Sequence, residues 1–133
     1  MESRVLAAVD RHNKGYNCAQ AIACTYCDLF GVDEQTAYKM TEAFGFGMGT
    51  QNVCGALSGA LVLAGLDGSG GVEAPGKTKG ATYKVARGLT AQFKDAAGAL
   101  LCSELKGGSS KVSCEDCIKF AAQMVEGSLL KDS

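Results

Sequence analysis

Apolar residues recur at helical spacing along most of the chain, and glycines separate the runs. Val5, Leu6 and Val9 form the first amphipathic run, which Gly15 can end. The second run, CAQAIACTYCDLF, follows Asn17, a residue type that is favoured at a helix N-cap. This pattern predicts helices on both sides of Gly15.

A third helix is predicted after Asp33, which is a second candidate N-cap. In this helix Ala37, Met40 and Phe44 form an apolar stripe, and the glycines within residues 45–49 end it. The three predicted helices lead into the glycine-rich stretch GFGMGTQNVCGALSGA, which holds one cysteine.

The run VCGALSGALVLAGL fits a buried helix or a buried strand by periodicity alone, but its alanines and its length favour a helix. Within it Gly55 and Gly59 lie four residues apart and form a small face on which another helix can pack closely. We expect that neighbour to bring Cys18 or Cys102 close to the run.

The second half of the chain reads as a loop followed by two helices. The segment LDGSGGVEAPGKTKG is rich in glycine and is predicted to be a loop. Residues 83–106 read as one long helix despite Gly88 and Gly98, and Ser113 with Asp116 forms a weak capping box for a last helix. No segment alternates as a strand would.

Length and composition fit one compact domain. The chain has 133 residues, of which 47% are apolar and 20% are charged. A chain of this length buries enough surface to fold without disulfides or a metal. We therefore expect an all-α fold, a single domain over residues 1–133 with about five or six helices, in which a glycine-rich loop leads into a central helix.

Charge and hydropathy argue against two classes of partner. The net charge is −1 and the 13 Lys and Arg residues are scattered, whereas nucleic-acid-binding domains usually carry a basic surplus. No segment reaches the roughly 20 apolar residues that span a bilayer. The charged N-terminal segment also lacks the apolar core of a signal peptide. We expect a cytoplasmic protein with no nucleic-acid partner and no membrane insertion.

Two glycine-rich segments match the sequence patterns of phosphate-binding motifs but lack the structural context that these motifs need. Residues 71–78 fit the P-loop pattern, and Gly45, Gly47 and Gly49 match part of the dinucleotide-binding pattern. Both motifs need a preceding strand, which a helical chain does not supply, and Glu73 would place negative charge beside the phosphates. We expect ordinary loops at both places.

The seven cysteines carry the candidate chemistry. Cys18, Cys54 and Cys114 fall at the starts of predicted helices, where free amide groups and the helix dipole stabilise a thiolate. Cys114 also begins the motif CEDC, which ends at Cys117, although the two carboxylates of this motif disfavour a thiolate. The alternative for each cysteine is a small buried hydrophobe.

The remaining candidates look structural from their positions. Cys24 and Cys27 lie inside a predicted helix, away from its N-terminus, and are expected to pack in the core. Cys102 lies near the end of the predicted long helix, where the dipole raises a thiol pKa. His12, the only histidine, is expected to be a solvated residue at the end of the first helix.

These motifs resemble the C_GCAxxG_C_C family of putative redox-active proteins, which is named for its cysteine pattern. The resemblance covers nearly the whole chain and rests on YNCAQA, on CGALSG with its glycine-rich approach, on CSEL, and on CEDC before an Ala-rich helix. By position, the family's four cysteines fall on Cys18, Cys54, Cys102 and either Cys114, which we prefer, or Cys117. The resemblance implies clustered thiols, includes Cys102 among them and supplies no substrate.

Three functions follow from these residues. The first is a thiol/disulfide redox centre in which Cys54 is the reactive thiolate, serving a redox partner protein or a small thiol. The second is an iron–sulfur cluster or a zinc ion bound by four cysteines, whose spacings match none of the usual short ligand motifs. The third is a helical interaction module in which the thiols only fill space. The candidate residues of the redox centre are Cys18, Cys54, Cys102, Cys114 and Cys117, and the first four are also the candidate metal ligands. The oligomeric state is left open.

Overall fold

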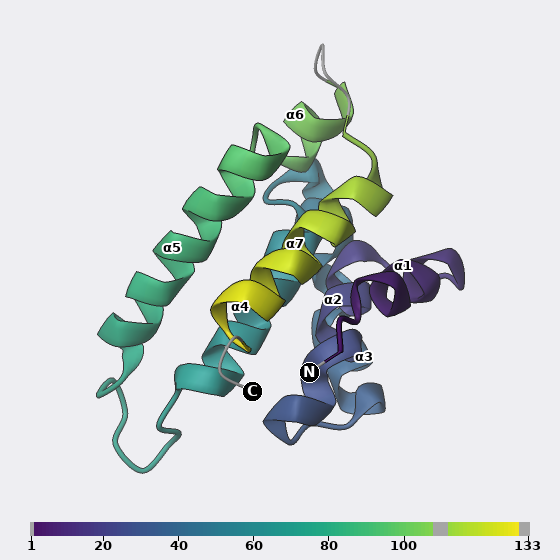
Figure 1. The fold of residues 1–133 in the computed structure, drawn as a ribbon. Coiled ribbons are helices and arrows are strands. Elements are labelled where there is room, and N and C mark those ends of the chain that lie inside the picture. Colours follow the sequence, from purple (N-terminus) through teal and green to yellow (C-terminus); the bar gives the residue numbers. More distant parts are fainter. Residues whose placement is uncertain (1, 108–111, 131–133) are drawn as a thin grey trace.

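The computed structural model describes residues 2–107 and 112–130, and these residues form a bundle of α-helices (Figure 1). The helices run over α1 (Val5–Asn13), α2 (Cys18–Tyr26), α3 (Glu34–Thr41), α4 (Gly55–Gly68), α5 (Lys79–Ala97), α6 (Cys102–Gly107) and α7 (Cys114–Ser128). Shorter helical turns span Cys27–Phe30, Glu42–Phe44 and Gly47–Gln51. The all-α prediction is confirmed, with seven α-helices in the described residues where about five or six were expected.

The centre of the bundle is formed by α2, α4 and α7. Helix α2 packs most extensively on α4, α5 packs on α4 and α7, and α1 packs on α2 and α7. Figure 1 shows α5 on one side of α4 and α7, and α1, α2 and α3 on the other, with α6 near the end where α7 begins. One core cluster joins these helices through side chains such as Ile22, Leu57, Phe93 and Ile118.

The two glycines near the start of α4 let α2 approach closely. A Cβ atom built on Gly59 would lie 2.6 Å from the carbonyl oxygen of Ala19, and one on Gly55 would lie 3.4 Å from the Cβ atom of Cys18. The small face expected on α4 is therefore confirmed. Helix α2 is the neighbour that fills it, and it brings Cys18 to the start of α4.

Replacing Gly59 with alanine should destabilise the fold. Alanine is normally the better helix former, but here its methyl group has to displace the backbone of α2, and such overpacking costs about 1–3 kcal/mol. Gly65→Ala is the matched control, because it lies in the same helix and a Cβ atom there meets nothing within 4 Å. Urea denaturation should show Gly59→Ala below the wild type and Gly65→Ala equal to it or up to about 1 kcal/mol above it. A Gly59→Ala variant as stable as Gly65→Ala would contradict this packing.

The single long helix expected over residues 83–106 is wrong. Helix α5 ends at Ala97, and Gly98 follows in the left-handed conformation with a φ of 92°. Glycine adopts this conformation at little cost and commonly ends a helix. A new helix, α6, then begins at Cys102.

A short bridge explains why the chain leaves the helix before Cys102. Val53 and Leu101 form an isolated antiparallel β-bridge. The Cys54 N–H donates a 2.8 Å hydrogen bond to a carbonyl in the segment before α6, and the Cys102 N–H donates a 2.6 Å bond to a carbonyl in the segment before α4. These bonds take the place of helical ones and hold Cys102 beside the start of α4.

Two apolar residues that were expected on buried helix faces lie at the surface. Leu6 is 72% exposed and Met40 is 52% exposed. Helix α1 instead buries Ala8 and Val9, and the short helix α3 buries Ala37 against α2. Both helices cover the bundle with a narrower stripe than the sequence indicated.

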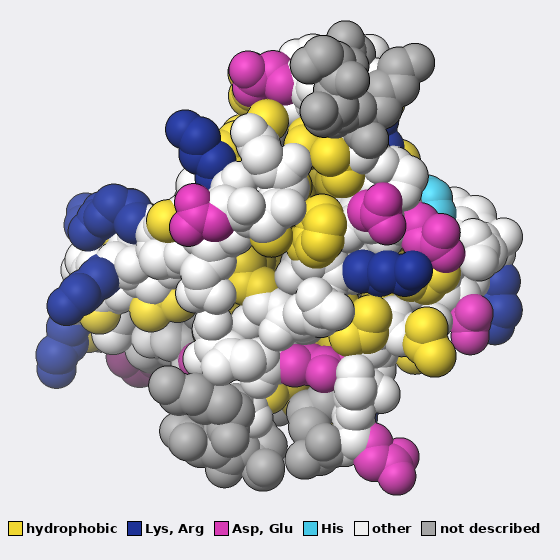
Figure 2. Space-filling view, turned by 45° about the horizontal axis from the view of Figure 1, so that its top comes forward, with side chains coloured by type: hydrophobic (Ala, Val, Ile, Leu, Met, Phe, Trp, Pro, Cys, Tyr) yellow, Lys and Arg dark blue, Asp and Glu magenta, His cyan; other side chains and the backbone are white. Residues whose placement is uncertain are grey.

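Residues 71–78 form a loop, as expected, whereas residues 47–49 belong to the short helical turn Gly47–Gln51. Residues 71–78 follow α4, and residues 45–49 follow the helical turn Glu42–Phe44, so neither segment comes after a strand. Figure 2 shows basic side chains along the α5 side of the molecule, and further basic side chains among acidic and hydrophobic ones over the rest of the visible face. Within the described part of the chain, no helix is long and apolar enough to cross a membrane.

Candidate cysteine site

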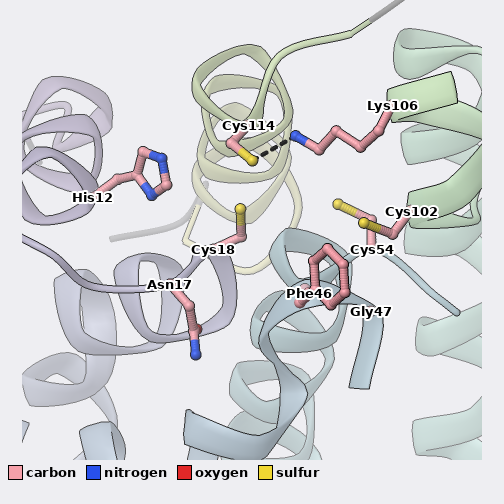
Figure 3. Close-up of a pocket in the computed structure, with 10 residues that line it drawn as sticks. His12, Asn17, Cys18, Phe46, Gly47, Cys54, Cys102, Lys106 and Cys114 are labelled. Atoms are coloured by element: carbon pink, nitrogen blue, oxygen red, sulfur yellow. Dashed lines mark hydrogen bonds between the residues drawn. The ribbon is translucent and has the colours of Figure 1, made fainter. Parts of the chain in front are cut away.

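A cavity of about 190 Å³ lies where four helices begin, and four cysteines line it. Cys18 is the first residue of α2, Cys102 of α6 and Cys114 of α7, while Cys54 directly precedes α4. Figure 3 shows their side chains around the same space. The fifth predicted site residue, Cys117, lies one turn further into α7 and is completely buried. The structure thus brings all five predicted cysteines to one end of the bundle.

Cys18 is fixed by the cap of its helix. The Asn17 side chain accepts a 2.8 Å hydrogen bond from the Gln20 N–H, and the Gln20 side chain accepts a 3.0 Å bond from the Asn17 N–H. The Asn17 amide also donates to the Glu42 carbonyl at 2.9 Å. The capping box fixes the start of α2, and the Asn17 amide ties it to the helical turn Glu42–Phe44, so that the Cys18 side chain is held at the cavity.

The loop before α4 is strained where it lines the cavity. Phe46, Met48 and Gln51 have φ values of 54°, 62° and 61°, a region that side-chain-bearing residues seldom adopt. Gly47 lies among them, and a Cβ atom there would come within 2.9 Å of the Cβ atom of Cys102. Strained backbone of this kind concentrates at binding and active sites, and here it places the exposed Phe46 ring at the cavity.

Cys114 lies between a cation and a thiol. The Lys106 ammonium donates a hydrogen bond to Cys114 Sγ, and Figure 3 shows the Cys18 sulfur directed toward the same atom. The pKa of Cys114 is lowered to about 5, chiefly because the Cys18 thiol donates toward its sulfur and further because of Lys106, while burial opposes the shift. Cys114 is therefore the most acidic thiol of the cavity, and it is only partly buried.

Cys54 also accepts from a neighbouring thiol, as Cys114 does. The pKa of Cys54 is lowered to about 7, first because the Cys117 thiol donates toward its sulfur. Burial opposes this shift, and the amide groups of Ala56 and Leu57 at the start of α4 add to it. Cys54 therefore gains part of its acidity from a helix start, as the sequence indicated.

The remaining cavity thiols are weaker acids. The pKa values of Cys18 and Cys117 are raised because each donates to a more acidic sulfur and is buried. The pKa of Cys102 is raised by burial and then by the neighbouring Cys54. The dipole of a long helix, which the sequence suggested as the cause for Cys102, is not available at the start of α6.

Cys114, rather than Cys54, has the lower pKa of the two acidic cavity thiols. Sequence reasoning preferred Cys54, the cysteine of the glycine-rich stretch, and the carboxylates of the CEDC motif made a lowered pKa of Cys114 less certain. In the structure, the Cys18 thiol, Lys106 and His12 lie across the cavity from Cys114 and lower its pKa. The pKa of Cys114 is therefore set by side chains across the cavity and not by the carboxylates beside it in the sequence.

The packing role expected for Cys24 and Cys27 is confirmed. Both side chains are buried in a separate small cluster with Ala23 and Ala37, on the α3 side of α2. Burial raises the pKa of Cys24 to about 12, so this thiol stays protonated at neutral pH. These two cysteines serve as internal controls for the five at the cavity.

Sequence reasoning missed Lys106 and misplaced His12. Both side chains line the cavity, and His12 is half-buried with its Nδ1 atom 3.0 Å from the Tyr16 carbonyl oxygen. The one signal for Lys106 was its position four residues after Cys102, which puts both on one helix face. No local pattern marks His12, because α1 reaches the cavity only through tertiary packing.

The described side chains form no ready-made metal site. Among residues 2–107 and 112–130, no group of three or more His, Cys, Asp or Glu side chains is arranged to hold a metal ion. The residues present do not fit a tetrahedral site without rearrangement.

Replacing Lys106 with methionine should shift the pH profile of Cys114 upward. The thiolate of Cys114 forms above pH of about 5 in the wild type, and removal of the ammonium takes away a group that stabilises it. We expect the midpoint of Cys114 alkylation by iodoacetamide to rise by about one pH unit or more. Lys84→Met, an exposed change on α5, is the control and should leave the midpoint unchanged. An unchanged midpoint in Lys106→Met would show that Lys106 does not act on Cys114.

Comparison with known proteins gave one match. The family described as "Putative redox-active protein (C_GCAxxG_C_C)" matches residues 16–127. No curated protein and no solved structure matches the chain significantly. The matched range contains every cysteine of the cavity as well as Lys106.

Proposed function

Since the chain belongs to the C_GCAxxG_C_C family of putative redox-active proteins, we propose that it carries out reversible thiol/disulfide chemistry in the cysteine cavity. Cys114 is the attacking thiolate and Cys18 is the thiol that completes the disulfide. The observation that carries this proposal is the position of Cys114 Sγ, which lies between the Lys106 ammonium and the Cys18 thiol. A thiolate with an adjacent thiol is the arrangement that disulfide exchange requires.

The reaction consumes one disulfide and forms another. The Cys114 thiolate attacks one sulfur of a substrate disulfide, which releases the first substrate thiolate and leaves a mixed disulfide on Cys114. Cys18 then loses its proton to the released thiolate and attacks Cys114 Sγ, which releases the second substrate thiolate. Overall, the substrate is reduced by two electrons to two thiols, and Cys18 and Cys114 are oxidised to a disulfide. In the reverse direction the same pair oxidises a dithiol.

The cavity limits what reaches these sulfurs. Cys18, Cys54 and Cys102 are all buried, and Cys114 is the one half-buried thiol among the four that line the cavity. A small disulfide, or an extended disulfide-bearing segment of a partner protein, therefore meets Cys114 before it meets the others. A reducing cytoplasm would keep such thiols reduced between reactions.

Controlled oxidation tests this function. Reduced protein is incubated with oxidised glutathione, remaining thiols are blocked, and disulfides are located by peptide mapping. We expect the first disulfide to join Cys18 and Cys114, and dithiothreitol to return both thiols. A protein that forms no reversible disulfide would overturn the proposal and favour an interaction module in which the thiols only fill space.

Metal binding is the alternative function of the same four cysteines, and metal analysis distinguishes it from disulfide chemistry. Four thiols on one cavity offer the ligand type of an iron–sulfur or zinc site, although their present arrangement does not fit one. We expect protein purified without oxygen to be colourless and to contain iron and zinc well below one atom per chain. Stoichiometric metal would instead assign Cys18, Cys54, Cys102 and Cys114 to ligation.

A further inference from the structure

We propose that Cys54 and Cys117 form a second redox pair, which exchanges with the Cys18–Cys114 pair so that one chain holds two disulfides. This inference rests on the proposed function and extends it to Cys117, a sulfur that no substrate can reach directly. It assigns a chemical role to Cys117, which lies outside the cavity lining.

The start of α7 connects the two pairs. Cys114 and Cys117 are three residues apart on this helix, so their side chains lie on the same side, one turn above the other. Cys114 faces Cys18 on α2, whereas Cys117 donates toward Cys54 at the start of α4. Cys18, Cys54 and Cys117 belong to one core cluster, and Cys114 packs against it. One helix turn therefore presents a sulfur to each of two neighbouring helices.

Access separates the roles of the two pairs. Cys117 is completely buried and does not line the cavity, so an external disulfide cannot attack or be attacked by it. Cys54 lines the same cavity as Cys18 and Cys114, and it is the second most acidic thiol there. Cys54 is thus the sulfur that both the outer pair and the buried thiol can reach.

The exchange needs no further reactant. The Cys54 thiolate attacks Cys114 Sγ of the Cys18–Cys114 disulfide and releases the Cys18 thiolate. The Cys117 thiol passes its proton to that thiolate and attacks Cys54 Sγ, which releases the Cys114 thiolate. The products are a Cys54–Cys117 disulfide, a Cys18 thiol and a Cys114 thiolate, so atoms, charge and electrons balance. A second substrate disulfide can then oxidise the outer pair again.

Stepwise oxidation of three chains tests this proposal. With excess oxidised glutathione, we expect wild-type protein to reach two disulfides, Cys18–Cys114 and Cys54–Cys117, with the other three thiols still free. Cys117→Ser should stop at the single Cys18–Cys114 disulfide. Cys24→Ser is the matched control, because it removes another buried cysteine and should leave both disulfides in place.

The rate of the second step tests the exchange itself. In Cys114→Ser the outer disulfide cannot form, so the Cys54–Cys117 disulfide should appear at least about tenfold more slowly than in the wild type. An unchanged rate would show that the pairs do not exchange. The map of wild-type disulfides is informative even if Cys117→Ser folds poorly. If oxidised wild-type protein ends with a single disulfide, or with a second disulfide that joins Cys54 to Cys102, the second pair is overturned. If oxidised wild-type protein forms no Cys18–Cys114 disulfide, the proposed function itself is overturned.

Discussion

Replacing Cys114 with serine is expected to abolish the fast, reversible oxidation of the cavity. The hydroxyl group of serine is not a nucleophile at neutral pH, and Cys18 has a raised pKa and little exposure of its own. The rate at which a disulfide reagent such as 5,5′-dithiobis(2-nitrobenzoate) reacts with the native chain should fall by about 100-fold or more, toward that of buried thiols. Stopped-flow absorbance measures this rate directly.

Cys24→Ser is the control for this change. Cys24 is buried in the separate small cluster and its pKa is raised to about 12 by burial, so it should contribute nothing to the fast phase. The fast phase of Cys24→Ser should equal that of the wild type. A fast phase that survives in Cys114→Ser would move the reactive thiolate to another residue, with Cys54 the first candidate.

Replacing Gly47 with alanine should unfold the cavity and destabilise the whole chain. Gly47 has a φ of 59°, and a Cβ atom there would lie 2.5 Å from the Asn52 backbone nitrogen and 2.9 Å from the Cys102 Cβ atom. Left-handed strain and the clash add up to about 2–4 kcal/mol of lost stability. Urea denaturation measures this loss, and the Cys114 labelling rate reports the cavity in the same samples.

Gly49→Ala separates the cost of left-handed backbone strain from the cost of the steric clash. Gly49 has a similar φ of 75°, but a Cβ atom at this position meets nothing within 4 Å. This variant should lose only about 1–2 kcal/mol, the cost of left-handed strain, and keep the wild-type labelling rate. If both variants lost the same stability, the contact between the loop and Cys102 would not constrain the site.

The helices could be predicted because their starts are marked locally. Asn17, Asp33 and Ser113 each accept a backbone hydrogen bond from the first turn of the helix that follows, as their side chains and positions indicated. The break at Gly98 could not be predicted in the same way. A glycine inside a helical pattern is compatible with either outcome, and here the long-range bridge between Val53 and Leu101 decides it.

The site was only partly visible in the sequence. Placement of Cys18, Cys54 and Cys114 at helix starts identified three of the sulfurs that line the cavity, because that signal is local. Which neighbours each sulfur faces was not visible, since that depends on how α7 lies between α2 and α4. The effect of Lys106 was hidden for the same reason, and the local carboxylates of the CEDC motif pointed in the opposite direction.

Cysteine-selective ¹³Cβ NMR tests the central claim most directly, because this chemical shift distinguishes thiol, thiolate and disulfide at each residue. We expect Cys114 to titrate to its thiolate with a midpoint near pH 5 in the reduced chain. One equivalent of oxidised glutathione at low temperature should then move Cys18 and Cys114 together to disulfide shifts before any other cysteine changes. A Cys114 signal that titrates near the ordinary thiol pKa, or a first disulfide that leaves Cys18 and Cys114 reduced, would contradict the assignment of this pair as the redox centre.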